Sequence, residues 1–134
     1  MSLRHEELSR SVIGAFYAVY NTLGYGFLES LYSAAMEHEL RDRGHRVDRE
    51  LPVTVCYRGR PIGTQRLDLV VDSKLVIEIK STSALHASAT RQLYNYLHAT
   101  RLETGLLFHF GPEPRFYRVA HFGTTRRTDE TDQI

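Results

Sequence analysis

The chain is poor in cysteine, and this scarcity limits both covalent cross-links and one class of metal site. Cys56 is the single cysteine among 134 residues, so an internal disulfide is excluded. A zinc site built on cysteine thiolates is disfavoured, and Cys56 is expected to be a small apolar residue of a strand. No apolar run approaches the roughly 18 residues of a membrane span, and no basic-then-apolar leader opens the sequence. These absences predict a protein of the reducing cytoplasm.

A strong excess of either charge is also missing. The 17 basic and 16 acidic residues leave a net charge of +1, and 42% of the residues are apolar. This composition is typical of a soluble globular domain, and a chain of this length buries roughly two thirds of its unfolded surface. The balance neither favours nor excludes nucleic acid as a partner, so a phosphate-binding surface would have to be local.

Several common catalytic signatures do not occur. There is no GxSxG motif for a serine nucleophile. The glycines of "GYG" at 24–26 lack both the preceding strand and the lysine of a phosphate-binding loop. None of the seven histidines has HxxxH spacing with another, which disfavours a zinc cluster on one helix. The chemistry must therefore be sought elsewhere.

Apolar periodicity predicts two helices in the first third of the chain. They cover residues 5–21 and about 28–43, with Gly24 and Gly26 as breakers between them and Gly44 as the C-terminal cap of the second. The apolar positions expected on the second helix are Leu28, Leu31, Tyr32, Ala35, Met36 and Leu40.

The period then changes to two, which is typical of strands. A later stretch returns to a helical period, and the last twelve residues show no apolar periodicity and are predicted to be disordered. The predicted strands are 51–59, 67–71, 75–79, 104–111 and 115–122, the third helix is 87–100, and the single domain is 1–122 with a tail at 123–134.

This order predicts an α/β fold with a mixed sheet. The first three strands follow one another closely, as in an antiparallel meander. The helix between the third and fourth strands predicts a right-handed crossover that places those two strands parallel. The helices are expected to pack against this sheet.

The stretch "RLDLVVDSKLVIEIK", residues 66–80, places charges inside two apolar runs. A hairpin centred on Ser73 would set Val70 opposite Val76 and Asp68 opposite Glu78, on one face of the sheet. Lys80, two residues beyond Glu78, would share that face. A slip of one residue would destroy this arrangement. The residues expected on the opposite, core face are Leu67, Leu69, Leu75, Ile77 and Ile79.

Two facing carboxylates repel each other, and a divalent cation between them removes the repulsion. Mg²⁺ is commonly held by one or two carboxylates together with waters and phosphate oxygens. Lys80 would then be placed to hold the attacking water or to neutralise charge on phosphorus in the transition state. The alternative is structural, with Lys80 merely pairing with Asp68 and Glu78 across the strands.

The spacing Asp68-x9-Glu78-x-Lys80 resembles the core motif of the PD-(D/E)XK nuclease superfamily. Gly26-x-x-Glu29-x-x-Tyr32 is similar to the signature of the GxxExxY protein family, which is grouped with these nucleases. Gln92-x-x-x-Tyr96 resembles a pattern of the RecB-like branch, and the resemblance runs over about 12–122. One departure is Leu67, which stands where the superfamily name has proline.

The resemblance implies a restriction-endonuclease-like mixed sheet flanked by helices, and it implies roles for particular residues. Asp68, Glu78 and the main-chain carbonyl of Ile79 would be ligands of Mg²⁺ or Mn²⁺, and Lys80 would lie beside the attacking water. Glu29 would support the metal from the first core helix. The implied activity is hydrolysis of phosphodiester bonds in DNA, with RNA as an option, and two copies could cut both strands as a homodimer.

The remaining site candidates each keep a structural alternative. Gln92 and Tyr96 share one helix face and would orient Lys80 or a phosphate and line the cleft. In the structural alternative, Gln92 is a solvated helix residue, and Tyr96 is a core aromatic whose hydroxyl lies at the rim. The alternative for Glu29 is an acid in the first helical turn that interacts with the helix dipole. His109 would approach the site from the fourth strand or be a satisfied sheet histidine. For the whole chain, the alternative function is a catalytically silent module that binds nucleic acid or protein.

Overall fold

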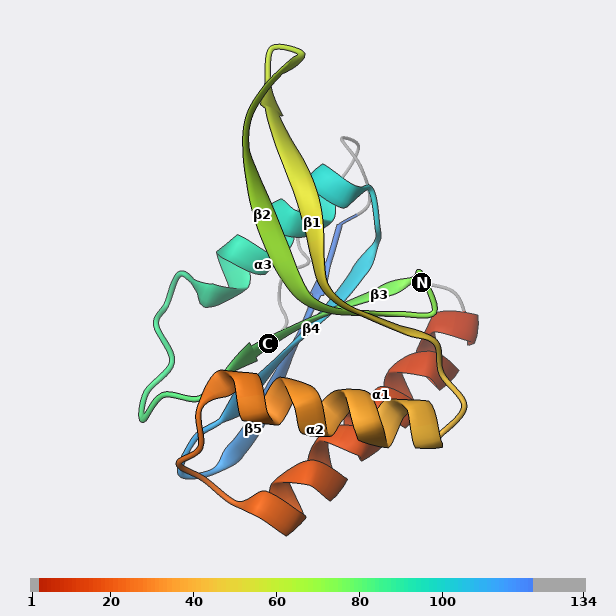
Figure 1. The fold of residues 1–134 in the computed structure, drawn as a ribbon, viewed down its shortest axis with the longest axis vertical. Coiled ribbons are helices and arrows are strands. Elements are labelled where there is room, and N and C mark those ends of the chain that lie inside the picture. Colours follow the sequence, from red (N-terminus) through yellow and green to blue (C-terminus); the bar gives the residue numbers. More distant parts are fainter. Residues whose placement is uncertain (1–2, 122–134) are drawn as a thin grey trace.

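A five-stranded mixed sheet forms the middle layer of the protein, with strand order β1-β2-β3-β4-β5 (Figure 1). The computed structural model describes residues 3–121, with side chains from residue 6 onward. Only β3 and β4 are parallel, and the other neighbours are antiparallel. The strands are β1 (Val47–Tyr57), β2 (Arg60–Val71), β3 (Leu75–Lys80), β4 (Thr104–Phe110) and β5 (Pro114–Ala120). The predicted meander and parallel crossover are thus confirmed.

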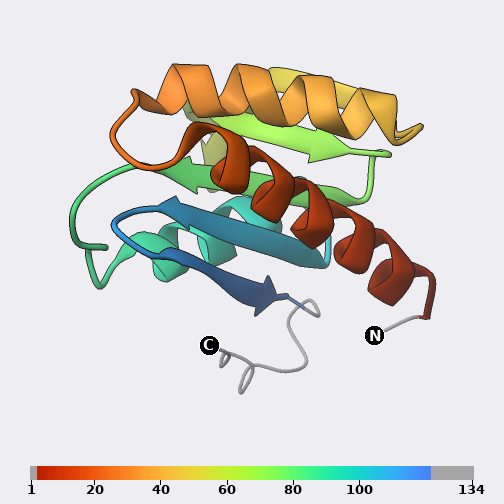
Figure 2. The same ribbon diagram turned by 90° about the horizontal axis from the view of Figure 1, so that it is seen from below.

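Helices cover both faces of this sheet, as Figure 2 shows. On one face lie α1 (Leu3–Leu23) and α2 (Glu29–Asp42), and on the other lies α3 (Ala89–Thr100). Each face has its own buried cluster. Phe16 of α1 stacks on Phe108 of β4 with ring centroids 4.4 Å apart. In the described part of the chain, no helix is long and apolar enough to span a membrane.

The predicted elements all occur, and the largest difference in bounds is at β2, which begins at Arg60 and not at Leu67. Gly44 follows α2 with φ 91°, and its amide donates to the carbonyl of Arg41, as expected of a C-terminal cap. Part of the predicted apolar face of α2 was wrong, because Leu28 is 73% exposed and Leu31 50% exposed. The helix buries Tyr32, Met36 and Leu40, which lie four residues apart on one narrow stripe. The predicted tail at 123–134 lies outside the described residues.

The hairpin of β1 and β2 extends well beyond the rest of the sheet, and α3 crosses it (Figure 1). Its tight turn has Arg58 and Gly59 at φ 52° and 77°, between the paired residues Tyr57 and Arg60. Two consecutive positive φ values are typical of a type I′ turn, whose twist suits a hairpin. Cys56 lies in β1 of this hairpin, as expected of a strand residue, and its side chain is exposed.

The bend of β2 explains a second difference from the sequence prediction. β2 pairs with β3 only from Leu69 to Val71, and the rest of β2 pairs with β1 alone. Leu69, Leu75, Ile77 and Ile79 are buried in the cluster under α1 and α2, as predicted. Leu67 belongs to the cluster on the α3 side instead. It lies in the part of β2 that does not pair with β3, because that pairing begins only at Leu69.

A polar network joins three segments on the α1 side of the sheet. His45 lies 2.7 Å from the Ser11 hydroxyl through Nε2 and 2.8 Å from the Asp72 carboxylate through Nδ1. The other Asp72 oxygen accepts the amide of Arg46 at 2.8 Å. Burial acts to raise the pKa of Asp72, but the Arg46 amide and the His45 ring outweigh it, and the pKa is lowered. The network fastens the β2–β3 turn to α1.

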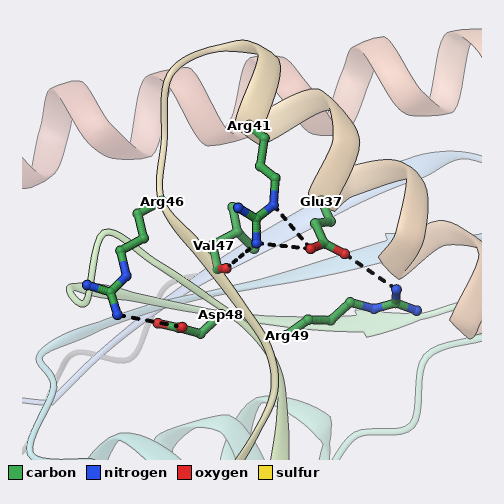
Figure 3. Close-up of polar contacts among 6 residues, drawn as sticks. All are labelled: Glu37, Arg41, Arg46, Val47, Asp48 and Arg49. Carbon is green, nitrogen blue, oxygen red and sulfur yellow. Dashed lines mark hydrogen bonds and ion pairs between the residues drawn. The ribbon is translucent and has the colours of Figure 1, made fainter.

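Ion pairs fix α2 against the start of β1 (Figure 3). The Glu37 carboxylate lies 3.1 Å from Arg41 and 3.4 Å from Arg49. Arg41 also donates to the carbonyl of Val47 at 2.7 Å, and Arg49 donates to the carbonyl of Ser30 at 3.3 Å. Because Ser30 follows Glu29, these contacts hold the first turn of α2 in place.

Candidate active site

The facing carboxylates lie where β2 separates from β3. The pairs Leu69–Ile77, Val70–Val76 and Val71–Leu75 are centred on Ser73, so the predicted register is confirmed. Extending this register by one step sets Asp68 opposite Glu78, although the ladder itself ends at Leu69–Ile77. At this point the Asp68 side chain, and not a backbone carbonyl, accepts the hydrogen bond: its Oδ2 lies 2.7 Å from the amide nitrogen of Ile79. A carboxylate therefore substitutes for a strand carbonyl at the end of the ladder.

Glu78 is buried with one of its two carboxylate oxygens unsatisfied within residues 3–121, while a backbone hydrogen bond from Asp68 and the charge of Lys80 favour its ionised form. It is 7% exposed, and its Oε2 is buried with no hydrogen-bond partner among the described residues. Burial, and next the charge of Asp68, raise the pKa of Glu78 to about 8. A buried carboxylate oxygen without a partner destabilises the ionised form, so a site that retains one is a candidate for function.

Asp68 has the same kind of environment, with one compensating contact. Burial raises its pKa, the amide of Ile79 opposes that change, and the Glu29 carboxylate adds to it. The pKa of Asp68 is raised overall. Two neighbouring acids that each favour protonation have an unmet need for positive charge.

Lys80 and Glu29 lie on either side of this pair. Lys80 ends β3, is half-buried, and acts to lower the pKa of both Asp68 and Glu78. Glu29 stands in the first turn of α2 and is exposed, contrary to its expected position near the buried stripe. Its Oε2 lies 3.4 Å from the amide nitrogen of Ser81, immediately after Lys80. The two side chains line one cleft of about 390 Å³.

Gly26 and Tyr32 fix the conformation of the loop before α2 and so determine where Glu29 lies. Gly26 has φ 116°, a conformation that side chains rarely adopt. The buried hydroxyl of Tyr32 donates to the carbonyl of Gly24 and accepts the amide of Phe27 at 3.2 Å. Its ring stacks on Phe110 of β4 with centroids 4.1 Å apart. The loop before α2 is thereby anchored to the sheet, which fixes where Glu29 begins the helix.

The two predicted residues of α3 lie in different places. Gln92 is exposed and lines the cleft of Glu29 and Lys80. Tyr96 is half-buried, and its hydroxyl donates to Oε1 of Gln65 at 3.2 Å. Burial raises the pKa of Tyr96, and the negative charges of Glu78 and Asp68 raise it further. Gln65 was missed because the strand was predicted to begin only at Leu67.

The histidines near the site have partners of their own. His109 is buried opposite Lys80 in the parallel pair, and its Nε2 lies 2.7 Å from the carbonyl oxygen of Thr82. This is the satisfied sheet histidine of the two alternatives. His86 accepts the amide of Ser88 at 3.0 Å before α3 and also lines the cleft.

The donor set suits a hard divalent cation. Among residues 3–121 no group of three His, Cys, Asp or Glu side chains is arranged to hold a metal. The pair Asp68 and Glu78, however, presents one buried oxygen without a partner, and Ile79 between Glu78 and Lys80 brings a main-chain carbonyl. Mg²⁺ is held by as few as one or two carboxylates, with waters and substrate oxygens completing the shell. The residues therefore fit such an ion.

The mixed sheet, the helices on both of its faces and the paired carboxylates together define an α/β protein with a restriction-endonuclease-like fold. A model of the PD-(D/E)XK nuclease superfamily matches residues 6–119, and the chain belongs to this superfamily. The crystal structure of SSO0001 is similar in fold, with a TM-score of 0.56 and 20% sequence identity over 88% of this chain. This chain spans 60% of that structure's length. No curated protein matches the sequence.

Proposed function

We propose that the protein hydrolyses phosphodiester bonds in DNA with the help of Mg²⁺ or Mn²⁺. The observation that carries this proposal is the unpartnered buried oxygen of Glu78 beside Asp68. A structural salt-bridge network would leave no such oxygen. The GxxExxY family and the RecB-like branch remain the groups whose motifs the sequence resembles, and a cytoplasmic location remains the expectation.

Each side chain has a role in this proposal. Asp68, Glu78 and the carbonyl of Ile79 would hold the ion, with Glu29 supporting it from α2. When bound, the ion would act as a Lewis acid towards the scissile phosphate. The Lys80 ammonium would donate a hydrogen bond to the attacking water and balance charge that grows on the phosphoryl oxygens. Gln92, across the cleft, would orient Lys80 or a phosphate oxygen, and Tyr96 would line the path of the strand.

Cleavage of labelled oligonucleotides, together with a small chromogenic diester such as bis(p-nitrophenyl) phosphate, tests the proposal. Wild-type protein should be active with Mg²⁺ or Mn²⁺ and inactive with EDTA. Lys80→Met should lose at least a hundredfold in rate, within the range that a single electrostatic stabiliser supplies. Lys74→Met, on the exposed β2–β3 turn, is the matched control and should remain active.

Two results would contradict the proposal. Activity that survives in Glu78→Gln with Asp68→Asn would show that a contaminant cleaves. DNA binding without metal-stimulated cleavage of any substrate would favour the alternative, a silent nucleic-acid-binding module with the same fold.

A further inference from the structure

A second depression, larger than the cleft of Lys80, lies between the β1–β2 hairpin and α3. Its volume is about 1040 Å³. Residues of both hairpin strands form one wall, and residues of α3 form the other. The residues that matter here are Cys56, Gln65, Tyr96, His98, Arg101 and His121. We call this depression the hairpin groove.

One end of the hairpin groove lies close in the chain to the carboxylate pair. Tyr96 lines the groove and donates a hydrogen bond to Gln65, which stands three residues before Asp68 on β2. The hydrogen bond from Tyr96 to Gln65 crosses from one wall to the other. The walls are therefore close together at the end nearest the site, and the groove leads away from it along α3.

The charges of the two walls differ from those of the rest of the chain. Residues 53–67 of the hairpin contain three arginines and no acidic residue. Residues 89–101, which are α3 and its C-cap, contain two arginines and no acidic residue. All 16 acidic residues of this near-neutral chain therefore lie outside these two ranges. The five arginines are all exposed, and of them Arg101 lines the groove while the others lie beside it on the same elements: Arg58, Arg60, Arg66 and Arg91.

Planar side chains lie along the same path. Tyr96, His98 and His121 line the groove, and the ring centroids of His98 and His121 are 4.9 Å apart. The charged residues in the described lining are Arg101 and Glu103, and the other arginines flank the groove on the hairpin and α3. Proteins that bind single-stranded nucleic acid without sequence preference combine positive charge along the strand's path with planar side chains on which bases stack.

From the position, the charge and the planar lining, we infer that the hairpin groove binds a single strand of nucleic acid and leads it to the carboxylate pair. The inference builds on the proposed function and adds a substrate class, a single strand or the single-stranded tail of a longer substrate.

Binding of fluorescent dT20 in Ca²⁺, measured by anisotropy at several salt concentrations, tests this inference. The double variant Arg60→Gln with Arg101→Gln should bind more weakly. The slope of log affinity against log salt should fall by about 0.7 for each arginine that no longer neutralises a phosphate, so by about 1.4 for the pair. The charge-matched control is Arg10→Gln with Arg46→Gln, two exposed arginines that lie on neither the hairpin strands nor α3, and its slope should equal that of the wild type. An unchanged slope in the groove variant would overturn the inference.

Cys56 offers a second measurement, since the chain has no other cysteine and Cys56 lines the groove. Excess dT20 should slow alkylation of Cys56 at least severalfold. It should leave unchanged the alkylation of a cysteine placed on exposed α2 by His38→Cys in a Cys56→Ser background. Equal protection of both cysteines, or of neither, would contradict a strand in the groove.

Hydrolysis of bis(p-nitrophenyl) phosphate separates this inference from the proposed function, because so small a diester needs no groove. Equal rates in the groove variant and the wild type, with weaker dT20 binding in the variant, support both proposals. No hydrolysis by the wild type, with dT20 binding that still depends on Arg60 and Arg101, would sink the catalytic proposal and support the groove.

Discussion

The substitution Glu78→Gln should make the protein more stable at alkaline pH while it removes activity. The folded protein holds the pKa of Glu78 at about 8, above the ordinary value of 4.5. The fold therefore favours the protonated form. The stability that this group contributes is complete below pH 4.5 and is lost as the pH rises to about 8.

The size of the effect follows from the gap between the two pKa values. At 1.36 kcal/mol per pKa unit, the ionised side chain destabilises the fold above pH 8 by about a few kcal/mol. Glutamine has nearly the same shape and no charge, and its amide can donate a hydrogen bond to Asp68. The difference in the free energy of unfolding between variant and wild type should grow from nearly zero at pH 5 to about a few kcal/mol at pH 8.5.

Urea unfolding at pH 5, 7 and 8.5 with EDTA present measures this difference. The matched control is Glu113→Gln, since Glu113 is 72% exposed on the β4–β5 turn, and its stability relative to wild type should stay constant over this range. A Glu78→Gln protein that is less stable than wild type at pH 8.5 would refute the reasoning. So would a stability difference that does not change with pH.

Three further predictions concern the surroundings of the site. Tyr32→Phe removes the hydroxyl that holds Gly24 and Phe27, so it should lower the free energy of unfolding by about 1–2 kcal/mol in urea, whereas Tyr25→Phe, on an exposed ring, should not. Gly105→Ala would set a methyl group 2.9 Å from Leu93 of α3 and should cost about 1–3 kcal/mol, while Gly63→Ala, with open space around it, should cost less than 1 kcal/mol. The folded pKa of Asp72 is lowered from 3.8, so the wild type should lose its advantage over Asp72→Asn as the pH falls below about 3.8; an advantage that persists at pH 2 would contradict the network of Ser11, His45 and Asp72.

The hairpin register could be predicted because strand side chains alternate between two faces. Only one centring of residues 67–79 buries the apolar residues together, and that centring also pairs Asp68 with Glu78. The alternation of side chains does not predict the bend of β2. The exchange of a ladder carbonyl for the Asp68 carboxylate, and the position of Leu67 under α3, both follow from that bend.

The parts that could not be predicted depend on contacts between distant segments. Leu28 and Leu31 fit a helical apolar period, but the sheet covers only the stripe of Tyr32, Met36 and Leu40. Ser11, His45 and Asp72 are too far apart in sequence for any local pattern to join them. The bond between Gln65 and Tyr96, which marks the start of the hairpin groove, required knowledge of where the hairpin lies relative to α3.

Titration calorimetry with Mn²⁺ at pH 7.5 tests most directly whether Asp68 and Glu78 together hold a divalent cation. Wild-type protein and Glu113→Gln should bind one ion with the same affinity, and Asp68→Asn and Glu78→Gln should each bind at least tenfold more weakly. Equal binding by all four proteins, or none by the wild type, would contradict the account.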